Sequence, residues 1–200
     1  MSSVDDVVAA IEAGGLVVIP TDTVYGLGCR PDSEESVREL SALKGRSSEQ
    51  PIALVAGGVD GLVELIPELP TALVLPGPFT LVLPNPARRL RWLTGQRPDT
   101  IGVRVPEVGG NAAELLTRVR VVAATSANLH GAPDPRRLSD VPEEILAGAA
   151  AALDGGELPG TPSTVLDLTG DEPRVLREGA VPAAEALARV AAALSDAQDP

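Results

Sequence analysis

The sequence predicts a single α/β domain built on one mixed, strongly twisted sheet that is flanked by helices. Apolar runs of strand length alternate with apolar residues at helical spacing, and no internal repeat or linker divides residues 1–200. The 20 glycines and 19 prolines keep the strands short, which favours a sheet with antiparallel parts over a regular doubly wound one. Aromatic residues make up only 2% of the chain, so valine, leucine and alanine must fill the core.

The first two predicted helices have clear boundaries. Ser3 and Asp6 form a capping pair in front of apolar residues at helical spacing, and Gly14 ends this helix. Ser33 caps a second helix that ends at Lys44.

The later helices are predicted from the same signals. We expect them over residues 60–66 (a short helix or a turn), 111–119, 139–146 and 182–194. Asn111 and Glu114 would form a capping box, and Ser139 or Asp140 would cap the helix that follows.

The first strand leads into a polar segment that could bind a ligand. Residues 16–19 read as a buried strand, and Pro20 ends it because proline cannot donate to a sheet ladder. Hydroxyls and one carboxylate follow in a loop that closes on Gly26 and Gly28. Ligands bind at strand ends in α/β sheets. The alternative is a plain polar turn capped by Asp22.

The other strands also end in polar residues. We expect strands within residues 52–56, 76–84, 101–105, 121–124, 163–168 and 173–176. Arg104 would lie on the polar face of a half-buried strand, and Ser126 and Asn128 follow the strand over 121–124. His130, the only histidine, lies in that same loop and is expected to be exposed to solvent.

Charge and cysteine content limit the classes of function. A single cysteine, Cys29, fits a reducing compartment. The acidic N-terminus is unlike a signal peptide and no apolar stretch could span a bilayer, so we expect a cytoplasmic protein without a membrane partner. The net charge of −12 argues against direct RNA binding.

Two groups of cations depart from this acidic background. Lys44 is the only lysine among 16 basic residues, and with Arg46 it flanks a glycine at a helix end. A compact ammonium suits a phosphate site. The alternative is a helix C-terminus stabilised by about 0.3–1 kcal/mol. The second group surrounds Trp92 and consists of Arg88, Arg89, Arg91 and Arg97. We interpret it mainly as a solvated surface, and the alternative is a weak contact with nucleic acid.

The candidate site residues share one kind of chemistry. The chain has no phosphate-binding loop motif, no dinucleotide fingerprint and no Cys/His metal cluster. Hydroxyl, amide and cationic side chains near strand ends remain: Thr21, Thr23, Lys44, Arg46, Thr80, Arg104, Ser126, Asn128, Ser163, Thr164 and Arg177. Such a set lacks a strong general base and suits phosphoryl or nucleotidyl transfer, which needs positioning and charge stabilisation.

Seven motifs give a resemblance to a known family. PTDTVYGLG, KGRSSEQPI, PGPFTLVLP, IGVRVP, ATSANLHG, STVLDL and LREGA occur in the order found in the YrdC/Sua5 family, from about residue 14 to 179. The resemblance, to the short TsaC type, implies a concave, positively charged cleft. It also implies an enzyme, an L-threonylcarbamoyladenylate synthase that makes threonylcarbamoyl-AMP and pyrophosphate from L-threonine, bicarbonate or CO2, and ATP. The product would serve the t6A modification of tRNA.

The resemblance assigns roles to residues at matching positions. Lys44 and Arg46 would be the catalytic cations that hold ATP phosphates, and Thr23 would contact threonine. Gln50 would be a ligand contact, although the family often has Lys or Asn there and Glu where Asp22 stands. The nucleotide and phosphate site would be lined by Thr80, Ser126 and Asn128.

Four further residues complete the implied site. Ser163 or Thr164 would lie near threonine or its carbamate, Arg177 near the nucleotide, and Arg104 would be a further cation of the cleft. Mg2+ would enter with ATP, with Asn128 as the one candidate protein ligand.

Two other functions are compatible with this sequence. One is a factor that binds double-stranded RNA or the ribosome without turnover. The other is carbamoyl-adenylate formation on a different substrate, as in hydrogenase-maturation relatives, whose acylphosphatase-like and zinc-finger regions this chain lacks. As a synthase, the protein would pass its product to the downstream t6A transferase machinery.

Overall fold

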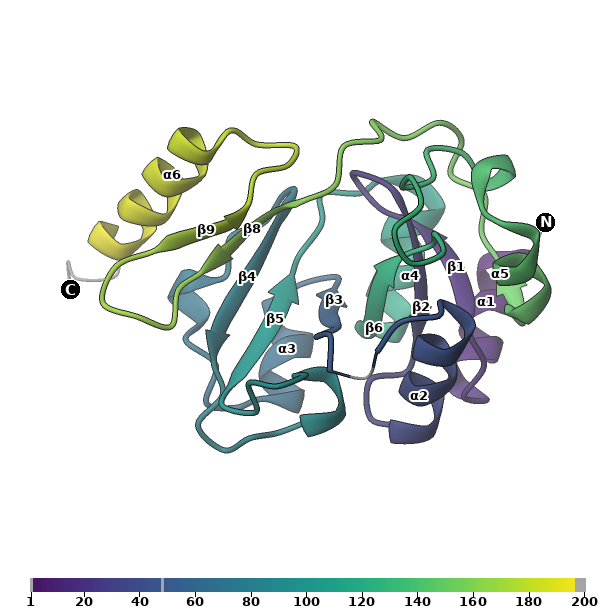
Figure 1. Cartoon of the computed structure of the whole chain (residues 1–200), viewed down its shortest axis with the longest axis horizontal. Coiled ribbons are helices and arrows are strands. Elements are labelled where there is room, and N and C mark those ends of the chain that lie inside the picture. Colours follow the sequence, from purple (N-terminus) through teal and green to yellow (C-terminus); the bar gives the residue numbers. More distant parts are fainter. Residues whose placement is uncertain (1, 48, 197–200) are drawn as a thin grey trace.

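One mixed sheet runs through the molecule in the order β7-β1-β2-β6-β3-β5-β4-β8-β9 (Figure 1). The computed structural model describes residues 2–47 and 49–196; Ser48, within the KGRSSEQPI motif, lies outside this part. The strands are β1 (Val17–Pro20), β2 (Tyr25–Cys29), β3 (Ala53–Ala56), β4 (Phe79–Pro84), β5 (Thr100–Arg104), β6 (Val121–Ser126), β7 (Ala151–Ala152), β8 (Thr164–Asp167) and β9 (Arg174–Arg177). The β1–β7, β3–β5 and β4–β8 pairs are parallel and the other neighbours are antiparallel, which confirms the mixed sheet.

Helices cover both faces of this sheet. They are α1 (Val4–Glu12), α2 (Glu34–Leu43), α3 (Val59–Leu65), α4 (Gly110–Val119), α5 (Glu143–Gly148) and α6 (Ala183–Asp196), with short 3-10 turns at Thr71–Leu73, Arg91–Leu93 and Leu138–Asp140. Val17 packs in one apolar cluster with α1 and α4, whereas the next residue, Val18, packs in a larger cluster with residues of α2, α3, α5 and α6. Successive strand residues point to opposite faces, so the two clusters lie on opposite sides of the sheet.

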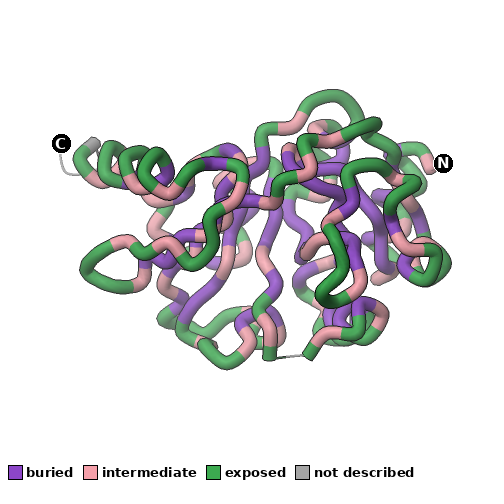
Figure 2. Tube along the Cα trace, turned by 45° about the horizontal axis from the view of Figure 1, so that its top comes forward, coloured by how far each residue is buried: buried purple, intermediate pink, exposed green. Residues whose placement is uncertain are grey.

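The core follows the strands, as the buried segments in Figure 2 show. Its largest fully buried side chains include Tyr25 and Phe79, and the rest are leucine and isoleucine. The expected aliphatic core is therefore confirmed. Within the described residues, no helix combines the length and the hydrophobicity that crossing a membrane requires.

Both predicted N-terminal caps are confirmed. Ser3 and Asp6 form a capping box, with the Ser3 N–H donating to Asp6 Oδ2 at 2.8 Å. Ser33 Oγ accepts from the Ser36 N–H at 3.1 Å and starts α2. Lys44 is the C-cap of that helix, as expected.

Two later caps were predicted wrongly. Helix α4 begins after Gly109 without any side-chain cap, so Asn111 and Glu114 form no capping box. A single helix over 139–146 is also wrong: a 3-10 turn ends at Asp140, and α5 starts after Pro142. Val141 is extended, and the α region is disfavoured for a residue that precedes proline.

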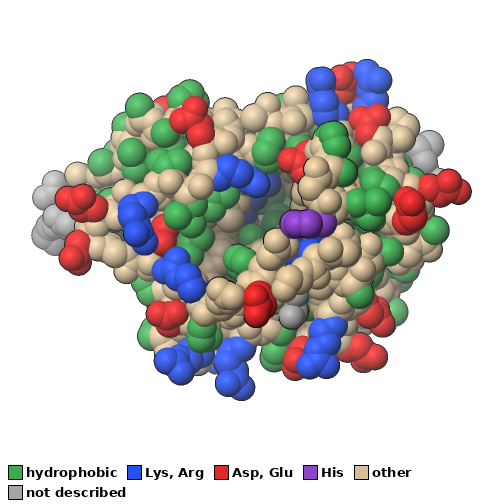
Figure 3. Space-filling model, viewed as in Figure 1, with side chains coloured by type: hydrophobic (Ala, Val, Ile, Leu, Met, Phe, Trp, Pro, Cys, Tyr) green, Lys and Arg blue, Asp and Glu red, His purple; other side chains and the backbone are tan. Residues whose placement is uncertain are grey.

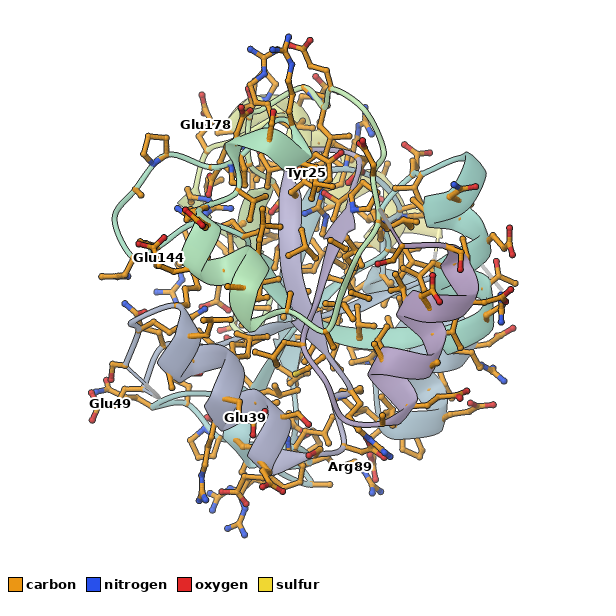
Figure 4. The ribbon with its side chains drawn as sticks, turned by 90° about the vertical axis from the view of Figure 1, so that its right-hand side faces the viewer. Tyr25, Glu39, Glu49, Arg89, Glu144 and Glu178 are labelled. Atoms are coloured by element: carbon orange, nitrogen blue, oxygen red, sulfur yellow. The ribbon has the colours of Figure 1, made fainter. Side chains whose placement is uncertain are left out.

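The segment after Pro20 is a hairpin rather than a loop that reaches Gly28. Residues 25–29 form β2, a fully buried strand between β1 and β6. Pairing on both sides outweighs the low strand preference of Gly26 and Gly28. Tyr25 lies inside the fold in Figure 4, where its hydroxyl donates to the Gly156 carbonyl at 2.8 Å.

Candidate active site

A cavity of about 490 Å3 opens on one face of the sheet. Its floor takes alternate residues of neighbouring strands: Ala53 and Val55 of β3, Thr80 and Val82 of β4, and Gly102 and Arg104 of β5. This alternation is what one face of a pleated sheet provides. Figure 3 shows a hollow near the middle of the molecule, with hydrophobic side chains inside it and basic ones at its edge.

One end of the cavity holds two cations and two hydroxyls. Thr80 Oγ1 and Ser163 Oγ lie 2.8 Å apart across β4 and β8. Arg177, on the edge strand β9, donates from Nη2 to the Ser163 carbonyl at 2.8 Å. Arg104 closes the same end from the terminus of β5. The arrangement offers donors to an anionic ligand.

Arg104 is held from one side by the β1–β2 turn. Its Nη2 donates to Thr23 Oγ1 at 2.8 Å and to Asp22, with which it forms an ion pair. Burial lowers the pKa of Arg104, the Asp22 charge opposes this, and the charge of Arg177 lowers it further. Arg104 Nε is buried and has no hydrogen-bond partner among the described residues. A buried guanidinium with an unused N–H favours an anionic partner.

The cap of this turn differs from the predicted one. Thr21 Oγ1 accepts the N–H groups of Thr23 and Val24 and donates to the Val24 carbonyl at 2.8 Å. Thr21 therefore caps the turn, and the carboxylate of Asp22 is free to reach Arg104. The plain turn capped by Asp22 is thus the wrong alternative.

Lys44 joins the end of α2 to the end of β6. Its ammonium donates to the Ser126 carbonyl at 2.6 Å, to the Asn128 carbonyl at 2.7 Å and to Asn128 Oδ1. Burial and the charge of Arg46 lower the pKa of Lys44 to about 8. Lys44 is therefore more than a cation at a helix C-terminus, because its ammonium fixes residues 125–128 (the TSAN segment) beside the cavity.

Arg46 lies between β6 and the segment before β3. It donates to Thr125 Oγ1 at 3.0 Å and to the Pro51 carbonyl at 2.9 Å, and both of these residues line the cavity. Burial lowers its pKa, and Arg46 Nε is buried without a hydrogen-bond partner in the described part of the chain. Arg46 thus resembles Arg104 in having donor capacity that the protein does not use.

The opposite end of the cavity was missed by sequence reasoning. Its lining residues are Glu49, Thr94, Gln96, Arg97 and Thr100. Thr100 and Arg104 are four residues apart on β5, so the two ends are separated by about 13 Å along the strand. Thr94 and Gln96 were missed because they belong to no strand or helix pattern in the sequence. Thr100 was missed because it directly precedes the strand predicted from Ile101.

The arginines around Trp92 form no uniform basic surface. Arg97 lines the cavity and pairs with the buried Asp167 at 2.9 Å, and Arg89 pairs with Glu68 at 2.7 Å. The carboxylates neutralise part of this group, which lowers its value as a nucleic-acid contact.

Most of the predicted site residues converge on this one cavity. Lining residues are Thr21, Thr80, Arg104, Ser126, Ser163 and Arg177. Hydrogen bonds to lining residues are made by Thr23, Lys44, Arg46 and Asn128. Segments that are far apart in the sequence therefore meet, as the motifs predicted. His130 is exposed, also as predicted.

Gln50 and Thr164 do not lie on the cavity lining. The Thr164 hydroxyl is buried and donates to the Val181 carbonyl at 2.6 Å while accepting from the Gly179 N–H at 3.0 Å. Thr164 thus secures the segment that follows β9, and of the two predicted alternatives only Ser163 faces the cavity. Successive strand residues point to opposite sides, which explains the difference.

Asn128 does not fit the role of a magnesium ligand. Its Oδ1 accepts from the Lys44 ammonium and from Ser126 Oγ, and its Nδ2 donates to the Ala132 carbonyl at 2.5 Å. An oxygen held by an ammonium is a poor ligand for a second cation. Among the described residues, no group of three or more His, Cys, Asp or Glu side chains is placed to hold a metal ion.

Comparisons with known proteins agree with this geometry. The family model Sua5/YciO/YrdC, described as telomere recombination, matches residues 9–179. A threonylcarbamoyl-AMP synthase of Pyrococcus abyssi is 38% identical over 184 residues, covering 88% of this chain and 53% of that protein. A threonylcarbamoyl-AMP synthase of Xanthomonas campestris is 35% identical over 159 residues, covering 76% of this chain and 84% of the other.

A solved structure supports the same relationship. The crystal structure of P. abyssi Sua5 in complex with L-threonine has a TM-score of 0.82 and 35% identity to this chain. The match covers 94% of this chain and 56% of that one. The chain thus has the fold of this structure but spans about half the length of the P. abyssi protein.

Proposed function

We propose that this chain, which belongs to the Sua5/YciO/YrdC family, is an L-threonylcarbamoyladenylate synthase. It would convert L-threonine, bicarbonate or CO2, and ATP into threonylcarbamoyl-AMP and pyrophosphate. The relatives named threonylcarbamoyl-AMP synthase and the threonine complex of P. abyssi Sua5 support this reaction.

The observation that carries the proposal is a cavity surrounded by cations: Arg104 and Arg177 line it, and Arg46 donates to its lining residues. Arg46 and Arg104 each keep a buried Nε without a partner among the described residues, and Arg177 stands beside Arg104. Guanidinium groups with free N–H groups bind carboxylates and phosphates well. A volume of about 490 Å3 lies within the usual range for small-molecule sites.

The chemistry fits a site without a general base. The amine of threonine takes up CO2 to give a carbamate and releases a proton. A carbamate oxygen then attacks the α-phosphorus of ATP, the bond to the bridging oxygen breaks, and pyrophosphate leaves. The nucleophile is already an anion, so the site must position it and offset negative charge.

The cations divide this work. Arg46 would supply positive charge beside the phosphates, because it donates to Thr125 and Pro51, which line the cavity. Lys44 donates to the Ser126 and Asn128 carbonyls and to Asn128 Oδ1, so it would supply positive charge from behind Ser126 and hold the TSAN segment in place. Arg104 and Ser163 would bind the threonine end.

Further parts of the proposal concern the surroundings of the enzyme. Mg2+ would enter bound to the ATP phosphates, without a ligand set from the described residues. The unstable product would pass to the t6A transferase machinery. A cytoplasmic location fits the use of ATP and tRNA chemistry and the single buried cysteine, Cys29.

Pyrophosphate release tests this function. The protein is incubated with MgATP, bicarbonate and one of several amino acids, and threonine-dependent release supports the synthase. Lys44→Ala and Asn128→Ala should each lower turnover strongly while circular dichroism shows an intact fold. If no amino acid supports release and the protein binds double-stranded RNA tightly, the RNA-binding alternative replaces the synthase. Release with another amino acid in preference to threonine would change the substrate.

A further inference from the structure

Asp22 and Arg104 form a buried bridge across the cavity end. Asp22 lies in the β1–β2 turn and Arg104 at the end of β5, and β6 and β3 separate β2 from β5 in the sheet. The side chains of Asp22 and Arg104 are only 9% and 8% exposed. Asp22 also accepts the N–H of Glu107 at 3.1 Å. One carboxylate thus ties the turn both to the cavity arginine and to the backbone beyond β5.

The bridge fixes the orientation of the guanidinium. Both hydrogen bonds that Arg104 makes use Nη2, one to Asp22 and one to Thr23. With Nη2 occupied, the planar guanidinium cannot rotate to follow a ligand, so the direction of its other N–H groups is set by Asp22 and Thr23. Nε has no partner within the described residues.

The position of the bridge favours a role in substrate binding. Arg104 lines the cavity, and Arg177 stands close enough for its charge to act on Arg104. Two neighbouring cations repel each other, and an anion placed between them offsets this repulsion. Asp22 offsets part of the charge from behind, and the cavity side remains available to a ligand anion.

We propose that Asp22 is a positioning residue: it holds Nη2 of Arg104 so that the remaining N–H groups meet the α-carboxylate of the amino-acid substrate. The inference rests on the proposed synthase function. Its ligand chemistry is a carboxylate next to the amine that becomes the carbamate. Asp22 itself touches no substrate.

Steady-state kinetics of three variants test this role. Asp22→Asn keeps the size of the side chain but removes its charge, and Asp22→Glu restores a carboxylate. Asp32→Asn makes the same chemical change in a surface ion pair with Arg30 and serves as the matched control. Pyrophosphate release is measured against L-threonine and against L-threoninamide, which lacks the carboxylate, and KM for ATP is recorded in parallel.

The expected results separate positioning from a general loss of structure. Asp22→Asn should raise KM for threonine at least tenfold, leave KM for ATP within twofold, and reduce the preference for threonine over threoninamide. Asp22→Glu should restore most of that preference, and Asp32→Asn should behave as wild type. Equal effects of Asp22→Asn on both KM values, or an unchanged preference, would overturn the proposal.

Two outcomes keep the test decisive in other cases. If Asp22→Asn does not fold, Asp22→Ser takes its place with the same expected and contradicting results, and similar kcat/KM of the wild type for threonine and threoninamide would by itself overturn the carboxylate contact. If the wild type shows no threonine-dependent release, the proposed function fails, and this result is distinct from a failure of the Asp22 assignment.

Discussion

Replacing Lys44 by methionine separates its functional role from its effect on stability. The substitution keeps the length of the side chain, which belongs to a residue only 5% exposed, but removes the ammonium that donates to the Ser126 and Asn128 carbonyls and to Asn128 Oδ1. We expect turnover to fall at least a hundredfold at pH 7, because the TSAN segment loses its anchor and the cavity loses a charge.

The lowered pKa of Lys44 makes the stability of the protein depend on pH, and the size of the pKa shift sets the size of this effect. The pKa of Lys44 falls from 10.5 to about 8 through burial and the charge of Arg46. Between these values the unfolded chain binds the proton and the folded protein does not, so the free energy of unfolding rises with pH in the wild type. The shift corresponds to about 3 kcal/mol, which Lys44→Met should lack.

Urea denaturation from pH 7 to 10.5 measures this effect. The free energy of unfolding of the wild type, less that of Lys44→Met, should grow by about 3 kcal/mol from pH 8 to 10.5. Tyr25 and Cys29 are present in both proteins, so their titration cancels. If the difference in the free energy of unfolding stays constant with pH, burial does not lower the pKa of Lys44. Turnover of Lys44→Met within threefold of wild type would refute the role of Lys44 in the site.

Three further predictions concern the framework of the site. Burial raises the pKa of Asp167, but the hydrogen bonds from Thr169 together with the hydrogen bond and charge of Arg97 outweigh burial and lower it to about 2. The corresponding stabilisation of about 2 kcal/mol should be present above pH 4, be lost as the pH falls to 2, and be absent from Asp167→Asn in urea denaturation. A Cβ at Gly179 would lie 2.2 Å from the Pro162 carbonyl, so Gly179→Ala should cost about 1–3 kcal/mol in the same assay and lower turnover. Tyr25→Phe removes the hydrogen bonds that join the buried Tyr25 side chain to exposed residues 154–156 after β7, and it should lower the melting temperature, at a cost of about 0.5–1.5 kcal/mol.

Each of these predictions has its own control or contradicting result. Gly170→Ala adds a Cβ with its nearest neighbour at 3.9 Å and should match the wild type. Gly179→Ala with wild-type turnover would show that the Pro162 segment tolerates displacement. Equal acid sensitivity of Asp167→Asn and wild type would exclude Asp167 as the group that titrates, and an unchanged melting temperature of Tyr25→Phe would show that water replaces the hydroxyl.

The sequence was sufficient for most elements and for much of the site because periodicity and strand ends are local signals. The strand over 52–56 and the cap at Ser33 needed only near neighbours in the sequence. The β2 strand was missed, because its glycines suggest a loop and only pairing with β1 and β6 stabilises them as a strand. The capping box at Asn111 failed because the helix starts at Gly110, so that Asn111 is already its second residue and cannot be the cap.

Contacts that are distant in sequence could not be predicted. The pairing of Asp22 with Arg104 spans 82 residues, and no spacing rule points to it. Arg97 looked like part of a surface cluster, yet it lines the cavity because Asp167 holds it there. Ser163 and Thr164 are equivalent as hydroxyls in the sequence, and only the strand pleat decides which one faces the cavity.

In the proposed reaction, one cavity joins threonine, a one-carbon unit and a nucleotide. This reaction can be followed by incubation with 13C-labelled bicarbonate, MgATP and L-threonine and by mass spectrometry of the adenylate fraction. We expect a threonylcarbamoyl-AMP species that carries one 13C atom and is lost in Lys44→Met. An adenylate without the label, or AMP as the only adenylate formed by the wild type, would contradict the proposed reaction.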